Sequence, residues 1–195
     1  MAEPLKNTVA LVTGASSGIG AAAARALAAD GACVAIAARR RDRLEQLAAE
    51  IGGGQSLVID ADLTEESGAR RAVEQTVSQL GRLDILVNNA GVMLLGPIVD
   101  APIDEWDRML RVNVEGLLHC THAALPHLLR AAEDGPRRVA DIVNISSTAG
   151  RTASSGTGVY NATKWGRQRL QRVAASGGHE AARARRAGRA WRRDH

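Results

Sequence analysis

Two residues in the last quarter of the chain have the types and spacing for proton transfer. Tyr160 and Lys164 are four positions apart, so a helix would place both side chains on one face. A nearby ammonium stabilises the phenolate form of a tyrosine, which suits the phenol to exchange a proton near neutral pH. The chain has only two lysines among its 25 basic residues, which favours a specific need for an ammonium at position 164 over an ordinary surface lysine.

A glycine-rich segment, Thr13–Gly20, follows a short apolar run and precedes an alanine-rich stretch. Glycines in a turn between strand and helix let the backbone approach a pyrophosphate, and the free N–H groups that begin the helix attract the anion. An ordinary strand-to-helix turn is the alternative, but the order of strand, turn and helix favours a dinucleotide site. The residues that we expect to bind the dinucleotide here are Gly14, Ser16, Ser17, Gly18, Ile19 and Gly20.

Two arginines, Arg39 and Arg40, follow the second apolar run of the chain. Sites for NAD(H) usually have a carboxylate at this place, which binds the ribose 2′-hydroxyl. Guanidinium groups instead form charge-assisted, often bidentate bonds with a 2′-phosphate. The residue types therefore favour NADP(H) over NAD(H), with a solvated basic start to the next helix as the alternative.

Apolar and amphipathic segments alternate regularly along the chain and must position these residues. Apolar runs predict strands at Thr8–Thr13, Cys33–Ala37, Ser56–Ile59, Leu83–Val87 and Arg138–Ile145. Helices are expected at Ile19–Ala29, Asp42–Ile51, Glu65–Leu80, Asp104–Arg130 with an interruption at Pro126, and from about Gly158 through Lys164. The alternation predicts an α/β fold of the Rossmann type, a doubly wound parallel sheet with its ligand at the carboxyl ends of the strands.

The length of the chain, its apolar runs and its cysteine and histidine positions argue against several other classes of protein. A length of 195 residues fits one domain, and the absence of a long apolar run or a leader pattern predicts a cytoplasmic protein without a membrane partner. Cys33 and Cys120 lie far apart in apolar segments, which indicates reduced core residues. No carboxylate or cysteine cluster accompanies the three histidines of one predicted helix, so we predict no metal site.

Together these motifs resemble the short-chain dehydrogenase/reductase family over roughly residues 5 to 166. The likeness rests on the Thr-Gly-x-x-x-Gly-x-Gly turn, on the Asn-Asn-Ala-Gly element at 88–91, and on Tyr-x-x-x-Lys preceded by Ser147 at a distance of thirteen residues. The stretches 35–40, 92–97 and 123–129 look like the branch that contains clavulanate-pathway aldehyde reductases.

The resemblance implies an oxidoreductase that transfers a hydride between NADP(H) and a small carbonyl or alcohol substrate. Tyr160 would donate or accept the proton, and Lys164 would bind ribose hydroxyls and tune Tyr160. Ser147 would hold the substrate oxygen, with the adjacent Ser146 structural, and Asn113 would anchor a proton-relay water. The remaining cofactor contacts that the resemblance implies are Asp62 and Leu63 beside the adenine, and Asn89, Ala90 and Gly91.

The last segment, 167–195, differs in composition from the domain predicted for residues 1–166. It holds nine arginines against Glu180 and Asp194, a net charge of +7, so the rest of the chain carries −3 of the total of +4. A single valine and no strand-like apolar run are typical of disorder. The family's sixth strand, Pro-Gly loop, substrate lid and seventh strand have no counterpart here, so the sheet would lack its last two strands.

A single-base frameshift near the Gly166 codon would explain this mismatch. In the shifted frame, back-translation of 167–172 can begin Val-Asn-Ala-Phe-Ser-Glu, as the family's helix continues, and 186–194 can give a Pro-Gly loop. The chain would then be an inactive dinucleotide-binding remnant, and the homo-oligomer expected for the family would be in doubt. A basic arm that binds nucleic acid and a natural truncation are the alternatives, although we expect no nucleic-acid partner.

Overall fold

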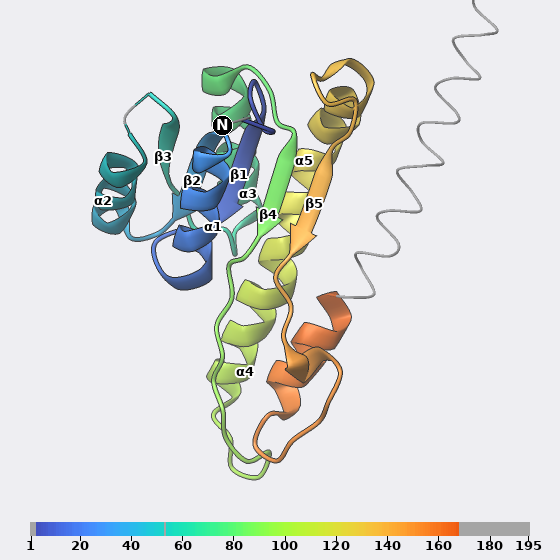
Figure 1. Ribbon diagram of the computed structural model, residues 1–195. Helices are drawn as coiled ribbons and strands as arrows, with labels where there is room; N and C mark the ends of the chain where they lie inside the picture. Colours follow the sequence, from blue (N-terminus) through green and yellow to red (C-terminus); the bar gives the residue numbers. More distant parts are fainter. Residues whose placement is uncertain (1–2, 53, 168–195) are drawn as a thin grey trace, which may run out of the picture.

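Five strands form one sheet in the order β3-β2-β1-β4-β5, and every neighbouring pair is parallel (Figure 1). The computed structural model describes residues 3–52 and 54–167. The strand order reverses between β1 and β4, which is the doubly wound arrangement that the alternating segments predict. The strands are β1 (Val9–Thr13), β2 (Cys33–Ala38), β3 (Ser56–Asp60), β4 (Ile85–Asn88) and β5 (Asp141–Asn144).

Helices cover both faces of the sheet because successive strand residues point to opposite sides. In β1, Ala10 and Val12 pack with α1 and α2 in one apolar cluster, whereas Leu11 packs with α3 and α5 in the other. No helix of the described residues is long and apolar enough to cross a bilayer. The α-helices are α1 (Gly18–Ala29), α2 (Arg41–Ile51), α3 (Glu66–Leu80), α4 (Ile103–Leu110) and α5 (Gly116–Asp134), and residues 158–167 are also helical.

The long helix expected over Asp104–Arg130 is interrupted at a different place from the one predicted. A π-helical turn, Arg111–Glu115, separates α4 from α5, whereas Pro126 lies inside α5 without ending it. π-helical turns inside α-helices are rare and occur frequently at functional sites. Asn113, at the centre of this turn, contacts the loop after β4.

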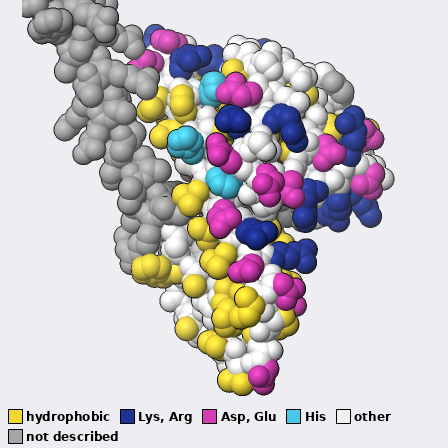
Figure 2. Space-filling model, turned by 180° about the vertical axis from the view of Figure 1, so that it is seen from behind, with side chains coloured by type: hydrophobic (Ala, Val, Ile, Leu, Met, Phe, Trp, Pro, Cys, Tyr) yellow, Lys and Arg dark blue, Asp and Glu magenta, His cyan; other side chains and the backbone are white. Residues whose placement is uncertain are grey.

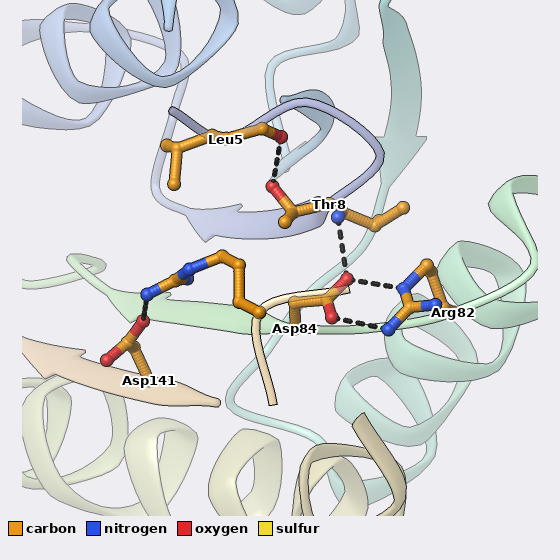
Figure 3. Close-up of polar contacts among 7 residues, drawn as sticks. Leu5, Thr8, Arg82, Asp84 and Asp141 are labelled. Carbon is orange, nitrogen blue, oxygen red and sulfur yellow. Dashed lines mark hydrogen bonds and ion pairs between the residues drawn. The ribbon is translucent and has the colours of Figure 1, made fainter. Parts of the chain in front are cut away.

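Asp84 joins the amino ends of β1, β4 and β5, and Figure 3 shows the contacts of its carboxylate. Its backbone N–H donates to the Val9 carbonyl and its own carbonyl accepts from the Asp141 N–H, both at 2.9 Å. Its carboxylate accepts from the Val9 N–H at 2.9 Å and from two nitrogens of Arg82 at 2.7 Å. The Asp84 side chain is fully buried, so its charge depends on this one guanidinium for compensation.

We predict that Asp84→Ala lowers the free energy of unfolding by about 3 kcal/mol, because it leaves the Val9 N–H without an acceptor and Arg82 without its buried partner. Urea unfolding followed by circular dichroism measures the change. Glu45→Ala is the matched control, since its ion pair with Arg41 is exposed and should contribute about 0.5 kcal/mol or less. An equal loss in the two variants would contradict the role given to Asp84.

Candidate active site

The site is built where β1 and β4 end side by side, and Thr13 joins the two ends. The Thr13 hydroxyl donates to the Val87 carbonyl at 3.1 Å and accepts from the backbone N–H groups of Asn89, at 3.0 Å, and Ala90, at 3.1 Å. The Asn89 side chain completes the joint by donating to the carbonyls of Thr13, at 2.9 Å, and Gly14, at 3.1 Å. The turn after β4 is therefore fastened to the glycine-rich turn after β1.

The glycine-rich turn tolerates no side chain at two of its positions. A Cβ atom at Gly14, where φ is +64°, would lie 2.7 Å from the Ala90 Cα, and one at Gly20 would overlap the Asn89 amide. Gly18 also has a positive φ, +57°, but nothing lies within 4 Å of its missing Cβ. Gly18 is the first residue of α1, and the backbone N–H groups of a helix N-terminus can attract an anion.

A cavity of about 460 Å³ runs along the carboxyl ends of the strands, a size typical of small-molecule sites. Most of the residues predicted from the sequence line it, whereas Gly18, Gly20, Asn113 and Ser147 do not. The predicted residues that line the cavity are Gly14, Ser16, Ser17, Ile19, Arg39, Arg40, Asp62, Leu63, Asn89, Ala90, Gly91, Tyr160 and Lys164.

Sequence reasoning missed several lining residues that carry no motif of their own. Each is next to, or within a few positions of, a strand end or a predicted site residue, and this position was the only signal that could have found it. The missed lining residues are Ala38, Ala61, Thr64, Val92, Met93, Val112, Ile145 and Ser146.

One end of the cavity is rich in hydrogen-bond donors. The Arg40 guanidinium donates to the hydroxyls of Ser16, at 3.0 Å, and Ser17, at 2.8 Å, which brings the second strand's arginine onto the glycine-rich turn. The Arg39 guanidinium lies 4.0 Å from the Asp62 carboxylate. Burial raises the pKa of Asp62, but two hydrogen bonds from Thr64 and the charge of Arg39 outweigh it and hold that pKa below its ordinary value.

Asn113 connects the turn after β4 to the helix that carries Tyr160. Its amide oxygen accepts from the Val92 N–H and its nitrogen donates to the Val92 carbonyl, both at 2.8 Å. The same nitrogen donates to the Thr163 hydroxyl at 3.1 Å. Both amide hydrogens are therefore used within the protein, and the predicted role of Asn113 in holding a relay water stays a prediction.

Tyr160 and Lys164 lie together at the other end of the cavity, as their spacing predicts. The Lys164 ammonium is 5.6 Å from the centre of the Tyr160 ring and donates to the Ile145 carbonyl at 3.2 Å. Burial, and then the charge of Arg167, lower the pKa of Lys164 to about 8. The ammonium therefore predominates at pH 7 and is lost as the pH rises through about 8.

The two serines after β5 are placed differently from each other. The Ser147 hydroxyl accepts from the Ala149 N–H at 3.2 Å and begins the short 3-10 turn Thr148–Gly150. Ser146, which we expected to be structural, lines the cavity. The role of Ser147 in holding a substrate oxygen accordingly stays a prediction.

Apolar side chains gather beside this end of the cavity. The connection from β4 into α4 carries exposed Met93, Leu95, Ile98, Val99 and Ile103. Figure 2 shows hydrophobic side chains over the lobe at the lower end of the molecule, where α4 lies in Figure 1. A bound molecule that enters from this side would meet an apolar surface.

Comparison with known proteins decides the family. The family model of the short chain dehydrogenases matches residues 8–182. The chain belongs to the short-chain dehydrogenase family. The predicted resemblance is thus confirmed, and members of this family bind nicotinamide dinucleotides and act on small molecules.

Individual relatives of the chain are longer than it is. The meso-2,3-butanediol dehydrogenase of Serratia marcescens is 34% identical over 158 residues, which cover 81% of this chain and 60% of that enzyme. A solved Serratia marcescens short-chain dehydrogenase/reductase variant superimposes with a TM-score of 0.78 at 37% identity, covering 86% and 66% of the two chains. A Sinorhizobium meliloti structure assigned to short-chain alcohol dehydrogenases gives 0.83 at 31% identity, covering 91% and 69%.

The basic segment predicted at 167–195 is described by the structure at one residue only. Arg167 is helical and buried, continuous with the helix of Tyr160 and Lys164. The rest of the segment, and with it the frameshift and basic-arm hypotheses, lies outside the described residues.

Proposed function

We propose that this chain carries the cofactor site and proton-transfer residues of an NADP(H)-dependent oxidoreductase that acts on a small carbonyl or alcohol. The observation that carries the proposal is one cavity with two different ends. Arg40 and the hydroxyls of Ser16 and Ser17 meet at one end, and Tyr160 and Lys164 meet at the other. The first end suits an extra phosphate, and the second suits an oxygen that gains or loses a proton.

The residues present fit a dinucleotide along the whole cavity. The glycine-rich turn, whose Gly14 lines the cavity and which leads into the N-terminus of α1, would receive the pyrophosphate, and Arg39 and Arg40 would bind the 2′-phosphate. Asp62 and Leu63 would contact the adenine, and Asn89, Ala90 and Gly91 would line the path to the nicotinamide. When bound, the cofactor supplies or accepts the hydride.

Side chains of the protein itself would transfer the proton. In the reductive direction the Tyr160 hydroxyl gives its proton to the substrate oxygen, while the Lys164 ammonium stabilises the phenolate that remains. The Ser147 oxygen accepts from the Ala149 N–H, and its hydroxyl hydrogen would be donated to that substrate oxygen. Asn113 keeps Thr163, and so the helix of Tyr160, at a fixed distance from the cofactor turn.

A second candidate is a dinucleotide-binding protein that performs no turnover. The observation that favours it is the apolar surface of the connection from β4 into α4, which is exposed beside the Tyr160 end of the cavity. The chain spans 60% of the length of the butanediol dehydrogenase that it matches. The two candidates share the cofactor site and differ only in catalysis.

We predict that Arg40→Gln weakens NADPH binding at least about tenfold, because it removes a charge-assisted contact with the 2′-phosphate. NADH, which lacks this phosphate, should bind to the variant with the same affinity as to the wild type. Titration of nucleotide fluorescence gives both dissociation constants. Arg41→Gln is the control, since Arg41 pairs with Glu45 and is not among the residues that line the cavity. An unchanged affinity for NADPH in Arg40→Gln would refute the NADP(H) preference.

We predict that Tyr160→Phe reduces NADPH-dependent turnover of aldehydes and ketones at least about 100-fold, because it removes only the hydroxyl that transfers the proton. The dissociation constant for NADPH should change little, since the ring remains. The turnover rate is measured from the oxidation of NADPH in the presence of each compound of a panel of aldehydes and ketones. Equal turnover in the two proteins would contradict the role of Tyr160, and a wild type that binds NADPH but turns over no compound would favour the second candidate.

A further inference from the structure

Arg167 is an arginine with no exposed surface, at the end of the described part of the chain. Its Nη1 donates to the Ala90 carbonyl at 3.1 Å and its Nη2 donates to the Asn88 carbonyl. Its buried Nε has no hydrogen-bond partner among the described residues. Burying a guanidinium costs free energy unless the charge is paired with an opposite charge and all its N–H groups are hydrogen-bonded. Arg167 is nevertheless buried behind the cofactor cavity.

The carbonyls that Arg167 binds belong to the turn that lines the cavity. Asn88 ends β4, and Ala90 and Gly91 follow in the wall of the site. A Cβ atom at Gly91 would lie 3.7 Å from Arg167 Nη1, 3.6 Å from Lys164 Nζ and 3.1 Å from the Asn113 amide oxygen. Two cationic groups therefore lie beside a single residue of the wall: Lys164 lines the cavity itself, whereas Arg167 lies behind Gly91, which has no side chain.

Among the described residues, the groups that face Arg167 do not neutralise its charge. From the β4 turn they are backbone carbonyls, from the π-turn the neutral amide of Asn113, and from its own helix Lys164 and the phenol of Tyr160. Within residues 3–52 and 54–167 no carboxylate forms an ion pair with Arg167 or Lys164. Burial lowers the pKa of Arg167 to about 10, so it keeps its charge at neutral pH beside a mostly charged Lys164.

We infer that Arg167 is a positioning residue that fixes the turn after β4 and makes the site bind the reduced cofactor more tightly than the oxidised one. The inference rests on the proposed NADP(H) function. A nicotinamide ring is uncharged when reduced and carries a positive charge when oxidised, so a second buried cation behind Gly91 repels only the oxidised form. Such repulsion is weakly screened because no bulk water lies around the Arg167 side chain.

The test compares the dissociation constants of NADPH and NADP⁺ for the wild type and for Arg167→Met, which keeps an unbranched apolar stem and removes the charge. The wild type should bind NADPH more tightly than NADP⁺, and the ratio of the two constants should move toward one by about tenfold in Arg167→Met. Arg167→Gln, which keeps donors for the two carbonyls, should lose the preference as well. If Arg167 had only a structural role, its substitution would weaken the binding of both nucleotides alike and leave the ratio of the two dissociation constants unchanged.

Arg40→Gln is the matched control, because removing a charge at the 2′-phosphate end should weaken NADPH and NADP⁺ equally. A wild type without preference for NADPH overturns the inference by itself, even if both Arg167 variants fail to fold as judged by circular dichroism. An unchanged ratio in either folded variant also overturns it, while leaving the proposed function intact. A wild type that binds neither nucleotide refutes the proposed function together with the inference.

Discussion

The hydrogen bonds between Thr13 and the turn at Asn89 are the joint on which the site depends. They link the ends of β1 and β4, the two strands between which the order of the sheet reverses. The glycine-rich turn follows one strand and the Asn-Asn-Ala-Gly element ends the other, so this joint holds together two turns that line the cavity. The close approach of Gly14 and Gly20 to the second turn shows that the joint leaves no room for a Cβ atom.

Features that depend on neighbours in the sequence could be predicted from it. The glycine-rich turn, the arginines after β2 and the pairing of Tyr160 with Lys164 all follow from local spacing on a strand end or a helix. The alternation of apolar and amphipathic segments gave the parallel sheet because strands buried on both faces have few polar residues. Among the strands only the ends moved, as with β4, which begins at Ile85 and not at Leu83.

Features that depend on contacts between distant residues could not be predicted. Asn113, at the centre of the π-turn, binds Val92 and Thr163, residues 21 and 50 positions away, and no local pattern reports such contacts. Arg167 belongs by composition to a basic segment, yet its position one turn after Lys164 points it at the carbonyls of the β4 turn. The burial of this charge results from tertiary contacts, whereas the composition of the segment indicated a charge exposed to solvent.

The positive charges of the site fall into two groups that differ in burial. Arg39 is 60% exposed by its side chain and lies at the end of the cavity proposed for the 2′-phosphate, where solvent screens its field. Lys164 and Arg167 are 5% and 0% exposed and lie at the end proposed for the nicotinamide. The exposed group can recognise a phosphate that stays charged throughout, whereas the buried group can respond to a charge that changes during the reaction.

The most direct test of the central claim is the fate of the transferred hydrogen. NADPH that carries deuterium at its transferable position would be incubated with the protein and an aldehyde, and the alcohol would be analysed by mass spectrometry and NMR. Direct hydride transfer in this site predicts one deuterium on the carbon that bears the new hydroxyl, with none arriving from deuterated water. Alcohol without deuterium at that carbon, or no alcohol from protein shown to bind NADPH, would contradict the claim.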